Sequence, residues 1–339
     1  MSSLTISRLN SGGLMTNYYC TSRCAHCLYN CSPGWPRDYI GADEAAECFS
    51  VMKRMGCRSA HIGGGEPLLA PEKLIEVLRA ARREKMQIEY VETNSSWFRD
   101  IESCIQTLND LKREGLSMLL VSISPFHNEH IPFHKVKGVM EGAGKTGIQI
   151  FPWIMEFFEE INAFDDRSPH PLSEYERQYG KGYVQLIPRK YWVNLGGRAL
   201  DTYSRAYPID TPKKLLEQSR GGCIELGNTN HFHIDLFGGY IPGLCSGLSI
   251  RKEDLGSPLS REKYPWLSAL HSGGVTELFS LASVKFGYAS ERDYIVKRHF
   301  ISKCHLCSDI RRFLVIDSKV ESPDLAPLHF YREMSPTSP

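Results

Sequence analysis

The sequence predicts an α/β protein whose parallel sheet forms an incomplete barrel. Short apolar runs alternate with amphipathic helical segments at a spacing of roughly 30 residues, as in strand–helix–strand units of a parallel sheet. The apolar runs that we interpret as strands lie near residues 14–19, 58–62, 88–92, 118–123, 147–154 and 190–195. Six such units make a partial (β/α)6 TIM-like barrel, and the chemistry of such barrels lies at the C-terminal ends of the strands.

Amphipathic stretches at 42–55, 71–83 and 101–115 are the clearest predicted helices, and Gly with Lys or Arg marks several of the helix ends. The polar segment 159–179 lies between the fifth and sixth predicted strands. We expect this segment to form a long loop or a short helix over the mouth of the barrel.

The pattern changes after about residue 205, where helical character falls and Gly and Cys recur. Residues 234–245 are typical of a hairpin that turns at Phe237-Gly238-Gly239. We therefore expect a barrel domain over 1–210, a small cysteine-rich domain over 211–322 and a flexible tail, rich in Pro and Ser, over 323–339.

The composition is that of a globular protein in a reducing compartment. The net charge is +1, so there is no electrostatic case for nucleic acid or an anionic membrane. No run approaches the ~18 apolar residues of a membrane span, and residues 1–11 lack a secretory signal pattern. We expect a cytoplasmic protein whose eleven cysteines are metal ligands, catalytic thiols or buried small side chains.

Three thiols at the spacing C-x3-C-x2-C, namely Cys20, Cys24 and Cys27, follow the first predicted strand. Three soft ligands on one tight loop suit an iron–sulfur cluster and do not suit calcium or magnesium. Three cysteines can hold three irons of a [4Fe-4S] cluster and leave the fourth iron open. The alternative is a structural zinc site that takes His26 or Cys31 as its fourth ligand.

A second motif, Gly63-Gly64-Gly65-Glu66-Pro67, follows the second strand, and by itself is typical of a tight strand-to-helix turn. Together the two motifs resemble the radical S-adenosylmethionine (SAM) superfamily. Gly64, Gly65, Glu66 and Pro67 match the G-G-E-P run that holds the methionyl amino group of SAM in that family. One departure is His26, which stands where the family usually has an aromatic residue before the third cysteine.

The resemblance implies that the open iron chelates SAM and that one electron cleaves SAM to a 5′-deoxyadenosyl radical. That radical abstracts hydrogen from the substrate. At the ends of the later strands, the resemblance makes Asn94, Ser122, Ser124 and Arg198 candidates for SAM binding, with turn chemistry or a surface position as the alternative. His127 and Glu129, which follow the fourth strand, are candidates for substrate contact, with a solvated loop as the alternative. Cys31 is a candidate hydrogen donor, with a buried structural thiol as the alternative.

Four later cysteines form a second set, with Cys223 and Cys245 around the predicted hairpin and Cys304 and Cys307 in a C-x2-C pair. The set could hold one closed metal site, and four-cysteine zinc is one reading. Its order resembles the twitch domain, a shortened SPASM extension of radical SAM enzymes, although the gap between Cys223 and Cys245 is slightly long. This resemblance implies one auxiliary [4Fe-4S] cluster that accepts an electron from the substrate radical.

These expectations favour a radical SAM oxidoreductase or maturase that oxidises a peptide or protein. The alternatives are a radical SAM dehydrogenase of a small metabolite and a non-catalytic zinc or iron–sulfur protein. The first two require an electron donor such as flavodoxin or ferredoxin.

Overall fold

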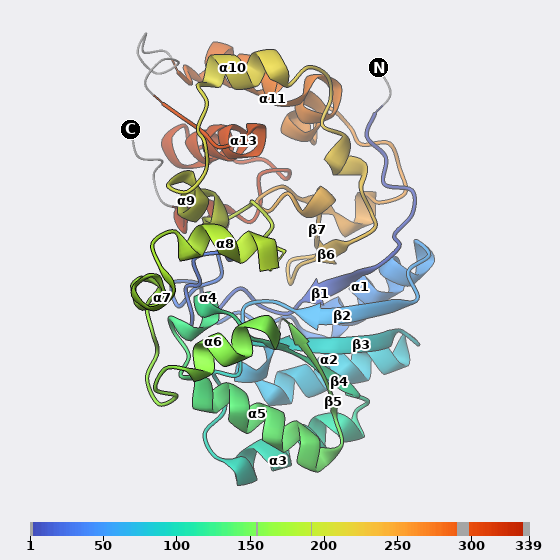
Figure 1. Ribbon diagram of the computed structural model, residues 1–339. Coiled ribbons are helices and arrows are strands. Elements are labelled where there is room, and N and C mark those ends of the chain that lie inside the picture. The colour runs from blue at the N-terminus through green and yellow to red at the C-terminus, as the bar shows by residue number, and fades with distance from the viewer. Residues whose placement is uncertain (1–2, 154, 191, 290–297, 335–339) are drawn as a thin grey trace.

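The computed structural model describes residues 3–153, 155–190, 192–289 and 298–334 (Figure 1). Its strands form one eight-stranded sheet in the order β5-β4-β3-β2-β1-β6-β7-β8. The strands are β1 Gly12–Met15, β2 Ser59–Gly63, β3 Gln87–Thr93, β4 Met118–Ser122, β5 Gln149–Trp153, β6 Phe232–Ile234, β7 Gly239–Ile241 and β8 Ile250–Arg251. β1 to β5 pair in parallel, as the alternation predicted.

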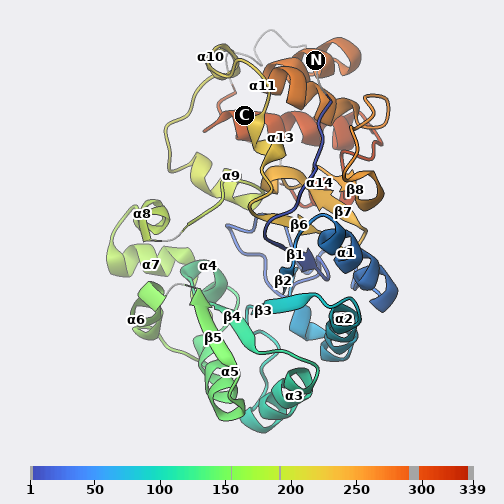
Figure 2. The ribbon, with the colours of Figure 1, turned by 90° about the vertical axis from the view of Figure 1, so that its right-hand side faces the viewer.

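Four helices follow the strands and cover the outer face of the parallel part: α1 Ala42–Arg54, α2 Pro71–Arg83, α3 Ile101–Arg113 and α5 Phe133–Thr146 (Figure 2). Local sequence explains their bounds. In α3 the Asp100 carboxylate caps the first turn by accepting from the Ser103 amide at 2.8 Å, while Lys112 and Arg113 end the helix. The buried residues Cys104, Leu108 and Leu111 form the face that packs inward.

The remaining helices lie around the mouth and in the C-terminal part. They are α4 Pro125–Asn128, α6 Phe158–Asn162, α7 Leu172–Tyr179, α8 Tyr183–Lys190, α9 Arg198–Ser204, α10 Pro212–Gln218, α11 Pro265–Phe286, α13 Lys303–Arg312 and α14 Leu328–Arg332, with a π-helical segment at Phe313–Asp317 and short 3-10 turns at Pro67–Leu69, Met155–Phe157, Ile224–Gly227, Pro242–Leu244 and Lys252–Asp254. The segment 159–179 thus contains short helices. None of the described helices has the length and apolar character that crossing a bilayer requires.

The α/β class is confirmed, but the expected strand at 190–195 was wrong for the residues described there. Lys190 ends helix α8, and residues 192–194 belong to no regular secondary structure. The apolar run that suggested a strand includes Trp192. Its side chain is 62% exposed, so it does not pack against a sheet. The sixth strand that pairs in parallel is instead β6, which lies on the other side of β1.

β6 and β7 form the expected hairpin, and β6 joins it to the barrel by pairing with β1. The two predicted domains therefore share one continuous sheet, and their separation at residue 210 stays a prediction. The expected flexible tail differs from the structure up to residue 334. Residues Phe330 and Tyr331 of α14 are almost fully buried, because their rings fill space beside Gly247.

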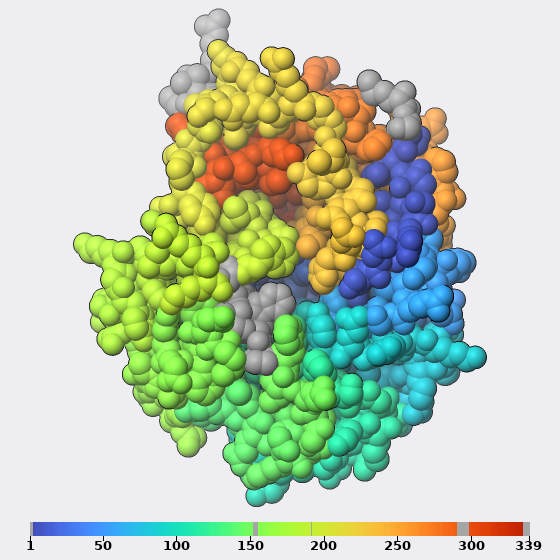
Figure 3. Space-filling view, turned by 45° about the vertical axis from the view of Figure 1, so that its right-hand side comes forward, coloured from blue at the N-terminus to red at the C-terminus, as the bar shows by residue number. Residues whose placement is uncertain are grey.

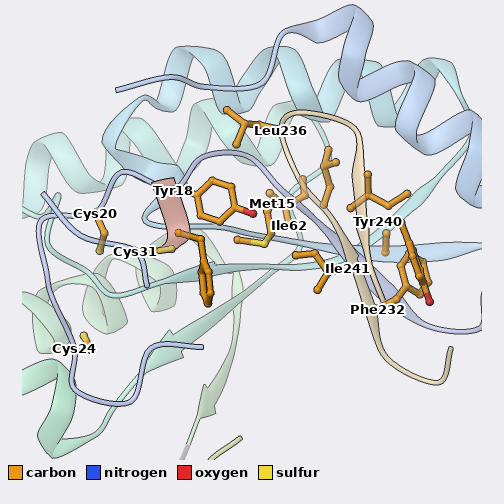
Figure 4. Close-up of a cluster of buried hydrophobic side chains, with 14 of the residues drawn as sticks. Met15, Tyr18, Cys20, Cys24, Cys31, Ile62, Phe232, Leu236, Tyr240 and Ile241 are labelled. Atoms are coloured by element: carbon orange, nitrogen blue, oxygen red, sulfur yellow. The ribbon is translucent and has the colours of Figure 1, made fainter. Parts of the chain in front are cut away.

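The core runs along the inner strands. Leu14 and Met15 of β1 and Ile62 of β2 have no exposed surface, and the hairpin residues Phe232 and Tyr240 are equally buried. Figure 4 shows this cluster continuing from the hairpin to the loop that carries Cys20, Cys24 and Cys31. The thiol loop is therefore attached to the buried core of the sheet.

Candidate active site

The first three thiols line one cavity of about 230 Å³ at the C-terminal ends of the parallel strands. The loop leaves β1, returns beside itself through a bridge between Tyr19 and Ser32, and turns at Cys24, whose carbonyl accepts from the Cys27 amide at 3.1 Å. Cys20 and Cys24 are buried, and Cys27 is half-buried. The structure therefore brings together the trio that the spacing predicted.

Arg198, at the start of α9, binds the backbone of this loop by hydrogen bonds. Its Nε donates to the Cys24 carbonyl at 2.9 Å, its Nη2 donates to the Cys31 carbonyl, and its backbone amide donates to the Cys27 carbonyl. Gly197 permits this approach, since a Cβ there would lie 2.3 Å from the Leu28 carbonyl oxygen. Two of the three guanidinium nitrogens thus bind protein, while the buried Nη1 has no partner among the described residues.

The C-terminal segment closes the other side of the loop. Ser32 donates from its hydroxyl to the Glu333 carboxylate at 2.7 Å, and Asn30 donates from its side-chain amide to the Phe330 carbonyl at 3.2 Å. These contacts join residues about 300 positions apart. They hold the thiol loop by a segment that the sequence pattern had marked as flexible.

The glycine motif lies against the same loop. A Cβ on Gly65 would come within 2.0 Å of the Tyr19 carbonyl oxygen, and Gly64 has a φ of +146°. Both positions therefore require glycine, and both present bare backbone to the cavity, which Pro67 also lines.

Glu66 is fully buried and accepts hydrogen bonds from three groups. Its carboxylate binds the Leu68 amide at 3.1 Å, the Thr93 hydroxyl at 3.0 Å and the Asn94 amide at 2.6 Å. Burial nevertheless raises the pKa of Glu66 to about 7, and the hydrogen bonds oppose that rise. The side chain lines the cavity, and it also connects the turn after β2 to the end of β3.

The candidates at the other strand ends divide into two groups. Asn94 and Ser122 line the cavity, and the Asn94 side-chain amide donates to the Cys20 sulfur at 3.2 Å. Ser124 is buried beside it but does not line the cavity, and its hydroxyl bonds the His127 Nδ1 at 2.7 Å. The geometry places Ser124 as a support for His127.

His127 lines the cavity, and burial lowers its pKa to about 4, so its ring is neutral near pH 7. Glu129 does not line the cavity. Its carboxylate accepts from the Leu172 amide at 3.3 Å and ties α4 to α7. His26 lines the cavity as well and stacks on Phe126, with ring centroids 4.5 Å apart.

Cys31 is a fourth thiol of the same cavity. A hydrogen bond from Cys31 to the Cys27 sulfur lowers the pKa of Cys27 to about 5 and raises the pKa of Cys31.

The second thiol set also gathers at one place, a cavity of about 380 Å³ lined by Cys223, Cys245, Cys304 and Cys307. Cys304 and Cys307 lie one turn apart on α13, where the Ser302 hydroxyl caps the first turn. In Figure 3 the orange-red residues of α13 lie at the back of a hollow framed by yellow segments. The two cavities share Asn194 and Leu244 in their walls, so these two residues form a partition between the cavities of the two thiol sets.

Positive groups accompany the second set. Arg311 is buried, lines the cavity and donates from Nη1 to the Ser246 carbonyl at 2.8 Å. Lys303 also lines the cavity and pairs with Glu225 at 3.0 Å. These cations offset the negative charge that four thiolates on one centre would bring.

The sequence analysis missed other residues that line the first cavity, and His231 and His233 stand out among them. They flank Phe232 in an H-x-H pattern, and on a strand this spacing puts both rings on one face. That spacing was the signal that could have identified them.

Cysteines and a glycine-rich turn at the C-terminal edge of a parallel sheet are the arrangement that is expected of a cluster-binding barrel protein. Residues 15–145 match the model of the radical SAM superfamily, so this part of the chain is a radical SAM domain. No curated protein matches the chain.

Several solved structures are similar over most of the chain. Native anSMEcpe with bound AdoMet is 15% identical, with 69% of this chain and 74% of that chain covered and a TM-score of 0.39. BtrN in complex with AdoMet and 2-DOIA is 15% identical, with coverages of 81% and 90% and a TM-score of 0.41. Streptococcus suis SuiB bound to S-adenosylmethionine is 14% identical, with coverages of 71% and 61% and a TM-score of 0.34.

The residues present fit both groups that the domain implies. Three thiols on one loop, with an amide donor on the Cys20 sulfur, are the donor set and outer-shell contact of an iron–sulfur cluster. The partnerless Nη1 of Arg198 and the bare backbone of Gly65 suit a ligand that carries a carboxylate and an ammonium.

Proposed function

We propose that this chain is a radical SAM enzyme in which Cys20, Cys24 and Cys27 hold a [4Fe-4S] cluster that binds SAM. When bound, this pair supplies reductive cleavage of SAM to a 5′-deoxyadenosyl radical, which abstracts hydrogen from a substrate. The observation that carries the proposal is the single cavity shared by the three thiols, Gly64, Gly65 and Glu66. A flavodoxin or ferredoxin is the expected source of the first electron.

In this proposal the chain's own residues position and shield the reactants. The backbone of Gly64 and Gly65 and the carboxylate of Glu66 receive the methionyl ammonium, and Arg198 Nη1 faces its carboxylate. Asn94 and Ser122 complete the wall. The buried loop behind them keeps water away from the site, which protects a reactive intermediate.

We also propose that the second thiol set holds an auxiliary [4Fe-4S] cluster. Four thiols fill every iron position, so this cluster has no site for substrate. The partition formed by Asn194 and Leu244 between the two cavities supports a role as electron acceptor. Transfer of the electron left on the substrate radical would make the overall reaction a two-electron oxidation.

The substrate that we favour is a peptide or protein side chain. Trp192 is 62% exposed and lines the first cavity, and Phe151 is 52% exposed with its ring 6.4 Å from Tyr90, another lining residue. Exposed aromatic rings beside a reactive cavity supply the large, rigid contact area that holds a docked chain. A small metabolite would need no such rim, which makes the dehydrogenase reading the alternative.

The test begins with anaerobic reconstitution. We expect about eight irons per chain, four for each cluster, and SAM cleavage with dithionite. The Cys24→Ala variant should lose SAM cleavage, whereas Cys304→Ala should keep part of it and lose oxidised product, as measured by mass spectrometry of candidate peptides. Cys104→Ala is the matched control, because Cys104 is a buried thiol of α3 outside both cavities.

The contrary outcome is a zinc protein. The contact between Cys31 and Cys27 places a fourth thiol within reach of the first set, as a closed zinc site would require. Bound zinc and no SAM cleavage would overturn the proposed function. Unchanged product in Cys304→Ala would remove only the role of the second set.

A further inference from the structure

A row of three residues crosses the sheet below the first cavity. β1 pairs with β2 so that Gly13 faces His61, and β1 pairs with β6 so that Gly13 faces His233. The glycine between the two histidines leaves a gap, and both rings reach across it. A Cβ on Gly13 would lie only 2.4 Å from the His61 Nε2.

The two imidazoles meet over this gap, with their Nε2 atoms 2.9 Å apart. His231, two residues before His233, brings a third ring whose centroid is 5.2 Å from that of His61 and 5.0 Å from that of His233. One nitrogen from each ring lies within 4.8 Å of the others. Two nitrogens that each bind one tetrahedral ion at about 2.1 Å lie about 3.4 Å apart. The His61 and His233 rings therefore need to separate by only about half an ångström to become two ligands of a common metal.

Further contacts fix the orientation of the rings. The Tyr29 hydroxyl bonds the His233 Nδ1 at 2.7 Å, and the His61 ring bonds the Gly12 carbonyl. Histidines that ligate metals are held in this way through the second ring nitrogen. His61 and His233 are 1% and 7% exposed, so bulk water cannot replace a missing ligand.

The site has a charge partner and an open side. The Glu92 carboxylate lies 3.9 Å from the His61 Nε2, in space that Gly63 leaves free, since a Cβ there would be 2.7 Å from a Glu92 oxygen. His231, His233, Glu92 and Tyr29 all line the cavity that also contains the first thiol set. A metal held by three imidazoles therefore keeps a coordination position toward that cavity.

We propose that His61, His231 and His233 bind one divalent transition metal, of which zinc is the first choice for three neutral imidazoles and an open position. Glu92 balances part of the charge. The ion would bind an oxygen of the substrate, a carboxylate, hydroxyl or carbonyl, and hold it against the cavity. This last role rests on the proposed function, whereas metal binding itself does not.

The test uses the cluster-loaded protein, in which iron occupies the cysteines. After removal of loosely bound metal, Zn²⁺ is measured by elemental analysis, and Co²⁺ is titrated while its absorption is recorded. We expect one equivalent beyond iron, with a cobalt spectrum of nitrogen and oxygen ligands and no thiolate charge transfer. His61→Ala and His231→Ala should each weaken this binding at least about tenfold, as loss of a ligand or its support does.

His130→Ala is the matched control, because His130 is exposed and lies outside the row. Iron content and circular dichroism show whether each variant is folded. If His61→Ala fails to fold, metal binding by His231→Ala tests the proposal, because His231 is only half-buried. No extra metal in the parent protein, or equal binding in parent and His231→Ala, would overturn the inference.

SAM cleavage measured in parallel separates the two proposals. Extra metal without SAM cleavage would overturn the proposed function and leave the metal site. SAM cleavage without extra metal would overturn the metal site and leave the proposed function.

Discussion

Arg198 and Glu66 show how a charged side chain can serve both a loop and a ligand. Each was expected to contact SAM, and each uses most of its hydrogen-bonding capacity on backbone groups of the protein. A buried charge needs such partners, because an unpaired one would cost several kcal/mol. The motif indicates that these residues matter, but the partners lie far away in the sequence and could not be deduced from it.

The buried carboxyl of Glu66 gives the protein a pH-dependent stability. Its pKa in the folded protein is about 7, above the ordinary value of 4.5, because burial disfavours the charged form. The contribution of the protonated form is complete below about pH 4.5 and is lost as pH rises through about 7. The shift corresponds to at most about 3 kcal/mol.

We therefore expect the cluster-free protein to lose stability between about pH 4.5 and about pH 7 more steeply than Glu66→Gln, whose side chain cannot ionise, and the two slopes should agree above that range. Urea unfolding at several pH values measures the two slopes. Glu72→Gln, at an exposed position of α2, should follow the parent slope. Equal slopes in all three proteins would show that Glu66 does not titrate in this range.

At the scale of elements, the β2–β1–β6 row depends on a strand residue without a side chain. Replacing Gly13 by Ala inserts a Cβ into the His61 ring and should destabilise the fold by about 1–3 kcal/mol, the usual cost of overpacking. It should also displace metal from the histidines while the first thiol set keeps its iron. Thermal unfolding and metal analysis measure both effects.

Gly144→Ala is the control for this substitution. Gly144 lies in α5 with no atom near its added Cβ, so alanine there should stabilise the helix by about 0.5–1 kcal/mol. Gly13→Ala protein with parent stability and parent metal content would contradict the role assigned to the gap.

Sequence patterns predicted those elements whose signal is local. The apolar alternation identified β2 to β5 and helices α1, α2 and α3, while the first strand lies at Gly12–Met15 and overlaps only the start of the expected run 14–19. Cysteine spacing identified both thiol sets. The strand expected at residues 190–195 was wrong because an apolar run is equally compatible with a buried strand and with the edge of a cavity. Trp192 is exposed and lines the first cavity. The histidine row could not be predicted because its members meet only through the pairing of β1 with both β2 and β6.

At the scale of the whole molecule, the described C-terminal segment completes the site. Phe330 is 1% exposed and packs beside Gly247, and its carbonyl accepts from Asn30 of the thiol loop. Phe330→Ala should cost about 3–5 kcal/mol, as for other buried aromatic residues. It should also speed hydrogen exchange of residues 20–35 in the folded protein.

Phe286→Ala, at the partly exposed end of α11, is the matched control and should leave that exchange unchanged. Hydrogen exchange with mass spectrometry locates the effect along the chain. An increase spread evenly over the protein would indicate general destabilisation and would contradict a specific link to the thiol loop.

The Ser32–Glu333 contact joins residues 301 positions apart, so the ribosome must add 301 residues after Ser32 before this contact can form. Until then, Cys20, Cys24 and Cys27 lack part of the support that holds them in the finished protein. Iron loading in the cell should accordingly be a step that follows translation, carried out on a chain that has already folded.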